Sequence, residues 1–308
     1  MKYLPFLHGL YSVAPGLIPV VRQENEFDRQ VFQIDDTYDQ YLANKMDCRR
    51  EDMHKYYQEA DFDANTCETV NEYILNQIIT DHPDKFELSF AGDRTVLLNI
   101  HTGEIIIWHT SSMEIIGSQY STLFDALSSQ LQEDLAVVQL AENSDWLAAI
   151  HLCAPNHWSP GEKIGQPFDH IHRPVPGMEK TMPHYRKMLE SAFNKGPFTR
   201  FAWGISTDNR LNHHPVPPPG QDPDSWRGRS AAASKRLYVR TEKQNLIGFS
   251  AINAFLFTIR TYFYPVDELS NVEKTALWTA VQSMSEEALQ YKGMQGVQEK
   301  LAELMLHD

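Results

Sequence analysis

The order in which helical and extended patterns follow one another most constrains how this chain of 308 residues can fold. Apolar side chains recur along one helical face in six segments, which predicts helices. These segments are 36–50, 66–80, 121–140, 185–193, 273–291 and 297–306. Short apolar or alternating runs predict strands. These runs are 86–90, the hairpin VLLNI-HTGE-IIIWH, 146–153, 198–205, 237–244 and 254–262.

This order lacks the regular alternation of strand and helix that a doubly wound fold requires. The sequence also has no G-x-G-x-x-G motif and no P-loop. We therefore expect an α+β fold, in which an antiparallel sheet is flanked by helices. The prediction is a single domain, 1–308, with an N-terminal helical extension over about 1–84 and C-terminal helices over about 270–308.

Composition excludes several classes of function. Acidic residues number 41 and basic residues 27, and the net charge of −14 argues against a nucleic-acid partner. No apolar stretch reaches the roughly 20 residues of a membrane-spanning helix. The three cysteines form no C-x-x-C pair and are too few for a four-cysteine cluster. We expect a reduced, cytoplasmic protein without a cleaved signal peptide, since prolines and glycines interrupt the N-terminal apolar region.

The segment 154–176 is rich in proline, glycine and histidine and is expected to form a long ordered loop. Within it, His170 and His172 form an H-x-H pattern, which on an extended chain directs both rings to one face. Such a pair could bind a metal ion, and a single histidine suffices as the axial ligand of a haem iron. With 13 histidines in the chain, a structural role for either one is the alternative.

Two further segments carry polar side chains where a strand is predicted. Period two places Tyr238, Arg240, Glu242 and Gln244 on one face of the strand 237–244, which either borders solvent or lines a pocket. In FTIRTY, Arg260 could hold a propionate or phosphate group with two hydrogen bonds, or form a structural ion pair.

Three segments together resemble one known family, the haem-dependent oxidative N-demethylase α-subunits. They are LQEDLAVVQL (131–140), WLAAIHLCAPNHWSPGEKIGQPFDHIHRPVPG (146–177) and LYVRTEKQNLIGFSAINAFLFTIRTY (237–262). The opening PFLHGLYSVAPGLIPV is also similar, so the resemblance covers roughly residues 5–270.

The resemblance implies a PAS-like fold, in which a five-stranded antiparallel sheet forms one wall of a pocket for haem b. It also implies O₂- and NADPH-dependent N-demethylation of a small methylated amine such as dimethylamine. Electrons would come from FMN and iron–sulfur cofactors on a partner reductase subunit. The residues support a borrowed reductase, because the chain has no dinucleotide motif and too few cysteines for a cluster.

The matching motifs imply roles for individual residues. His172 of I-H-x-P-V-P is the expected axial iron ligand, with His170 as the other histidine of the loop that could bind iron, and Lys163 is expected to hold a propionate. Arg240 would stabilise negative charge near bound O₂. Glu242 would accept the amine charge or a proton.

Tyr238 lies on the same face and is expected to act in catalysis by orienting Arg240 or Glu242. Gln244 and Arg260 are expected to bind the cofactor. The chain departs from the family pattern at Lys243, where a second arginine is usual, and in IGFSA, which leaves the identity of the amine open.

Other functions remain open from the residues alone. One is a haem-binding PAS-type sensor without turnover, since a fold does not determine a function. Another is a zinc enzyme using His170, His172 and a third histidine, either His184 or His214. A variant of the haem-binding hypotheses has the Cys153 thiolate, in place of a histidine, bind the haem iron.

Overall fold

The computed structural model describes residues 2–14, 16–179, 182–228, 231 and 234–306. Within them, strands form a large and a small antiparallel sheet, with helices on both sides of the large one, so the α+β prediction is confirmed. The large sheet has seven strands. Across the sheet they run in the order β1 (Ile18–Pro19), β8 (Phe198–Ser206), β9 (Tyr238–Phe249), β10 (Ala254–Pro265), β6 (Asp134–Leu140), β7 (Asp145–His151) and β2 (Tyr57–Glu59).

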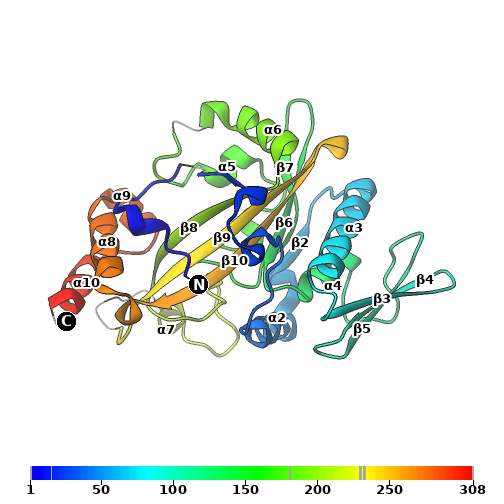
Figure 1. The fold of residues 1–308 in the computed structure, drawn as a ribbon, viewed down its shortest axis with the longest axis horizontal. Helices are drawn as coiled ribbons and strands as arrows, with labels where there is room; N and C mark the ends of the chain where they lie inside the picture. The colour runs from blue at the N-terminus through cyan, green and yellow to red at the C-terminus, as the bar shows by residue number, and fades with distance from the viewer. Residues whose placement is uncertain (1, 15, 180–181, 229–230, 232–233, 307–308) are drawn as a thin grey trace.

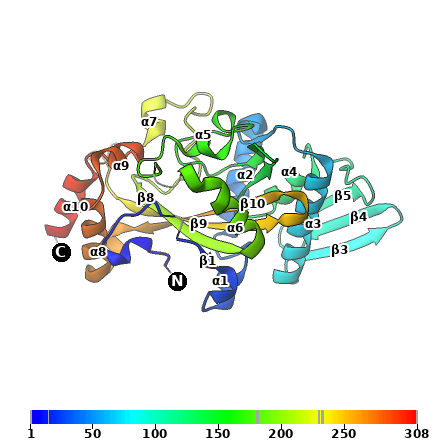
Figure 2. The same cartoon turned by 90° about the horizontal axis from the view of Figure 1, so that it is seen from above.

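The small sheet lies at one end of the molecule, and the C-terminal helices lie at the other (Figures 1 and 2). It consists of β3 (Phe86–Ala91), β4 (Arg94–Asn99) and β5 (Glu104–His109). Gly103 turns the chain between β4 and β5 with φ of +74°, a conformation that glycine adopts without steric cost. The predicted hairpin is therefore confirmed.

Four of the six predicted helices are confirmed with small shifts of their ends. The helices are α1 (Glu26–Arg29), α2 (Tyr38–Asp52), α3 (Ala64–Asp81), α4 (Leu123–Ser129), α5 (Phe168–His172), α6 (Tyr185–Lys195), α7 (Pro223–Arg227), α8 (Asn271–Gln282), α9 (Glu286–Tyr291) and α10 (Val297–Leu306). No helix in the described part of the chain is long and apolar enough to cross a bilayer.

Two helix predictions are wrong in extent. The segment 121–140 contains the short helix α4 and then strand β6, which is buried on both faces and therefore shows no polar alternation. Leu131 and Leu135 lie four residues apart there only by coincidence. The segment 273–291 is divided because the Ser285 hydroxyl accepts the N–H of Ala288 and begins a new helix.

The two faces of the large sheet carry different side chains. Arg240 pairs with Gly204, Glu242 with Ala202, and Gln244 with Arg200 across β8 and β9, so these side chains share one face. We call it the Glu242 face. Helices α5 and α6 and the loop 154–167 cover its apolar part through Phe168, Ile171 and Leu189, among others.

The opposite face, here called the Arg260 face, carries the main core. Ile74 of α3 and Leu127 of α4 pack there against Val137 and Leu256 of the sheet. Residues of the small sheet join the same cluster, so the two sheets share one core.

Candidate functional site

The expectation for strand β9 is confirmed, since Tyr238, Arg240, Glu242 and Gln244 alternate onto one face. Arg240 is only 3% exposed. It donates from Nη2 to the Ala154 carbonyl at 2.7 Å, and the same nitrogen lies 3.5 Å from the Glu242 carboxylate. The Gln244 amide donates to the other Glu242 oxygen at 2.9 Å. Glu242 is therefore held from two sides.

Three cationic side chains from different elements interact electrostatically with Glu242. Burial lowers the pKa of Lys163 and of Lys292 to about 8 in each case, although the Glu242 charge opposes the shift. Burial also lowers the pKa of Arg200, again against Glu242. Lys163 lies 3.6 Å above the Trp158 ring centroid. The site thus holds one carboxylate among several partly dehydrated cations.

His172 lies at the end of α5, on the loop that covers this face. Its Nδ1 lies 2.8 Å from the Phe168 carbonyl, and its ring stacks on the Phe168 ring with centroids 3.9 Å apart. Because a carbonyl only accepts, Nδ1 carries the proton and Nε2 keeps its lone pair. Burial, together with the charges of Lys163 and Arg200, lowers the pKa of His172 to about 4. The imidazole is therefore neutral near pH 7 and able to bind a metal through Nε2.

The expected geometry of the H-x-H pair is wrong. Residues 168–172 form a helix, in which side chains two positions apart differ by about 200°. His170 is accordingly exposed, whereas His172 is partly buried.

The zinc site proposed around this pair is also wrong. His184 is exposed, and His214 packs on Tyr56 elsewhere in the fold. Among the described residues, the only three potential ligand side chains whose donor atoms converge are those of Asp134, His151 and Cys153.

Arg260 does not belong to the Glu242 face. It pairs with Lys243 across β9 and β10, so it points to the opposite side of the sheet. There its guanidinium lies 2.8 Å from the Asp35 carboxylate and 3.8 Å above the Tyr41 ring centroid. The structural ion pair is the correct alternative, and a contact with a ligand bound on the Glu242 face is excluded.

A small cavity of about 20 Å³ lies beside Arg240. Gly204, Ser206, Asn156 and Lys292 are among the residues that line it. A side chain added at Gly204 would meet no atom within 4 Å of its Cβ. The cavity can hold a molecule of the size of water or dioxygen, but it is too small for a porphyrin.

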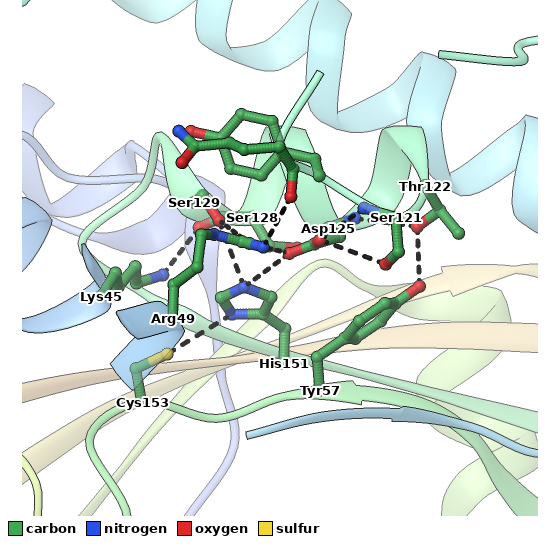
Figure 3. A network of polar contacts seen from close by, with 12 residues as sticks. Lys45, Arg49, Tyr57, Ser121, Thr122, Asp125, Ser128, Ser129, His151 and Cys153 are labelled. Atoms are coloured by element: carbon green, nitrogen blue, oxygen red, sulfur yellow. Dashed lines mark hydrogen bonds and ion pairs between the residues drawn. The ribbon is translucent and has the colours of Figure 1, made fainter. Parts of the chain in front are cut away.

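A second polar cluster lies in the interior, around His151 (Figure 3). His151 faces the Asp125 carboxylate with Nε2 at 3.4 Å and the Cys153 sulfur with Nδ1 at 3.9 Å. Although burial opposes it, the contacts with His151 and Arg49 lower the pKa of Asp125 to about 2. Burial raises the pKa of Asp134 to about 6.

Sequence reasoning missed several of these residues. Arg200 and Lys292 join the Glu242 face only because β8 pairs with β9 and because α9 ends beside β8. The alternation Arg200, Ala202, Gly204, Ser206 contained a signal, since small and polar residues share one face of that strand. The H-x-C spacing of His151 and Cys153 was likewise overlooked as a pair.

The sequence model of one family, haem-dependent oxidative N-demethylase, alpha subunit-like, matches residues 23–302. This match covers nearly the whole chain, including β6 to β10, the loop with His172 and both polar clusters. The chain therefore belongs to the haem-dependent oxidative N-demethylase, alpha subunit-like family.

Proposed function

We propose that this chain is the haem-binding catalytic subunit of an oxidative N-demethylase acting on a small methylated amine. Haem b would bind over the Glu242 face, with its iron held by His172, in a PAS-like arrangement built on the five central strands β8, β9, β10, β6 and β7. A flavin and iron–sulfur reductase subunit would deliver electrons from NADPH. The location we propose is the cytoplasm.

The observation that carries this proposal is the state of His172. Its Nδ1 is occupied by the Phe168 carbonyl, and its ring is neutral and partly buried. An axial histidine of haem needs these features, because the hydrogen bond at one nitrogen orients the ring and the other nitrogen binds iron.

The charges around His172 match the haem periphery. Lys163 and Arg200 both influence the His172 ring electrostatically and are partly buried. The Arg200 Nε is a buried donor for which no partner is described. Two carboxylate side arms of a porphyrin would satisfy such cations with charge-assisted hydrogen bonds. Haem, when bound, would supply the iron at which dioxygen is reduced and activated.

Glu242 is the group that would receive the substrate. A methylated amine is cationic near pH 7, and Glu242 is a carboxylate fixed by Gln244 and Arg240. Tyr238 lies on the same face and would help to orient the amine. Glu242 could then take up the proton that the amine must lose before its oxidation.

Arg240 would act mainly through the fixed position of its guanidinium. Two carbonyl groups of the loop, those of Ala154 and Pro155, accept hydrogen bonds from its guanidinium. Its Nε is buried, with no partner among the described residues. That donor, and the charge behind it, would stabilise negative charge that develops beside Gly204.

The proposal requires the site to open. Because the cavity beside Arg240 measures about 20 Å³, haem entry needs the loop 154–177 to move away from β8 and β9. The apolar contacts of Phe168 and Ile171 on the sheet would be exchanged for contacts with the porphyrin.

Turnover with a reductase tests the function. Haem-loaded protein, a flavin and iron–sulfur reductase, NADPH, O₂ and dimethylamine should together release formaldehyde. Glu242→Gln should raise KM for the amine by at least about tenfold, since it removes a charge-assisted contact. Glu142→Gln, at an exposed position between β6 and β7, is the control and should behave as wild type.

Absence of formaldehyde from a panel of small methylated amines, with haem bound and reduced by the partner, would contradict the enzymatic role. That outcome would favour the haem sensor.

A further inference from the structure

The interior cluster around His151 has no part in the proposed reaction. Asp134 begins strand β6, His151 ends strand β7, and Cys153 follows two residues later. All three are at most 1% exposed, and their ligand atoms lie within 4.8 Å of one another. Antiparallel pairing of β6 with β7 brings these ends together, because Leu135 pairs with His151. The fold therefore concentrates a carboxylate, an imidazole and a thiol in the interior.

The imidazole of His151 is oriented by a carboxylate. Its Nε2 lies 3.4 Å from Asp125 Oδ1 and 3.4 Å from the Ser129 hydroxyl (Figure 3). Asp125 is itself fixed by Arg49 and by the backbone N–H of Ser121 at 2.9 Å. Metal-binding histidines generally donate the N–H of the nitrogen that does not bind the metal to a carboxylate, a backbone carbonyl or water, and Asp125 would be such a partner here. The other nitrogen, Nδ1, faces Cys153.

We propose that Asp134, His151 and Cys153 form a buried structural zinc site. Thiolate, imidazole and carboxylate are the three ligand types of zinc in proteins. Tetrahedral coordination with Zn–S of about 2.3 Å and Zn–N of about 2.0–2.1 Å separates sulfur and nitrogen by about 3.6 Å. The observed Sγ to Nδ1 distance is 3.9 Å, so a small inward movement completes the geometry.

The Asp134 carboxylate is already fixed for this purpose. Its two oxygens accept the backbone N–H groups of Cys153 and Ala154, each at 2.8 Å. Each oxygen keeps a further lone pair, which a metal ion could use.

Cys48 is the expected fourth ligand. Its sulfur lies 3.8 Å from the Cys153 carbonyl oxygen, its thiol interacts with the Cys153 side chain, and it is 1% exposed. The nearby formal charges also favour Cys48 as a ligand. Asp125, Asp134 and two cysteine thiolates supply four negative charges, which a zinc ion, Arg49 and Lys45 balance. Lys45 is held close by the carbonyls of Ser128 and Glu133.

Burial argues that the site is structural. A catalytic zinc keeps an open coordination position for water or substrate, whereas a structural zinc is closed by protein ligands. Cys153 and His151 are both completely buried. The metal would join α2, through Cys48, to the ends of β6 and β7, which lie side by side at this end of the sheet.

The test is the zinc content of the full-length protein produced with added zinc and without haem. Wild type should hold about one zinc per chain, as should Cys67→Ser, whose cysteine on α3 lies outside the cluster. Cys153→Ser and His151→Ala should lose the metal. Asp125→Asn should weaken binding by about 10–100-fold, since it removes only the orienting carboxylate.

Cobalt substitution keeps the test decisive if the variants do not fold. Folded wild-type protein loaded with Co²⁺ should show a thiolate-to-cobalt charge-transfer band and the ligand-field bands of a tetrahedral site. Folded wild type with neither zinc nor a cobalt band would overturn the proposal, and so would unchanged zinc content in folded Cys153→Ser. The cluster would then be a metal-free hydrogen-bonded network.

Discussion

Replacement of Arg260 by methionine tests how the N-terminal extension is attached to the sheet. The guanidinium is 1% exposed and lies 2.8 Å from Asp35, which the extension contributes just before α2. At this separation, opposite unit charges attract by about 6 kcal/mol at an effective dielectric constant of about 20. Dehydration cancels part of this attraction, and loss of one partner of a buried pair typically costs about 3–5 kcal/mol.

We therefore expect Arg260→Met to lower the free energy of unfolding by about 3–5 kcal/mol and Tm by about 5–8 °C. Urea unfolding followed by tryptophan fluorescence, with a thermal melt by circular dichroism, measures both quantities. Arg236→Met is the matched control, because Arg236 also pairs with acidic groups but its side chain is 39% exposed. Its loss should be much smaller, since water and salt screen exposed pairs.

The same variant also tests the assignment of Arg260 to the face opposite Glu242. Folded Arg260→Met should give the wild-type haem spectrum. The reasoning would be refuted if Arg260→Met lost no more stability than Arg236→Met, or if its haem spectrum changed while the fold was retained.

Three further predictions concern two residues that sequence reasoning did not select, Gly204 and Lys292. Gly204→Ala should raise stability by about 0.5–1 kcal/mol, because alanine is better than glycine in a strand and its Cβ meets no atom within 4 Å. Gly204→Leu should fill the space beside Arg240 and weaken haem binding in a spectroscopic titration; wild-type affinity would show that haem does not use this space. Burial lowers the pKa of Lys292 to about 8 in the folded chain. Between about pH 8 and 10.5 the unfolded chain therefore binds more protons than the folded chain. The unfolding free energy should therefore rise with pH across that window, by at most about 3 kcal/mol before screening by solvent. Lys292→Met should have a flatter profile, and an identical profile would contradict this origin.

Sequence periodicity was sufficient where a prediction concerned one strand. Tyr238, Arg240, Glu242 and Gln244 share a face because alternation is a local property of extended chain. Arg260 shows the limit of such reasoning. Its strand was predicted correctly. The face of the sheet on which the Arg260 side chain lies depends on the register of β10 with β9, and register is set by tertiary contacts.

The errors in the loop and in β6 both arise where the hydrophobic pattern does not identify the element. Residues 168–172 form only one helical turn or slightly more, too short for a period to be detected, and this turn separates His170 from His172. In β6 the apolar run is buried on both faces, and a leucine spacing of four residues then imitated a helix. Arg200, Lys292 and the cluster around His151 depend on contacts between segments distant in sequence, which one chain read alone does not reveal.

The visible spectrum of the protein reconstituted with haem tests the central claim, that His172 binds the haem iron. His172→Ala should abolish or grossly alter the Soret band and its shift on reduction and CO binding, because no other group is placed to replace Nε2 in our account. His170→Ala, on the same helix but exposed, should keep the wild-type spectrum. An unchanged spectrum in folded His172→Ala would contradict the account and assign the ligand to another residue.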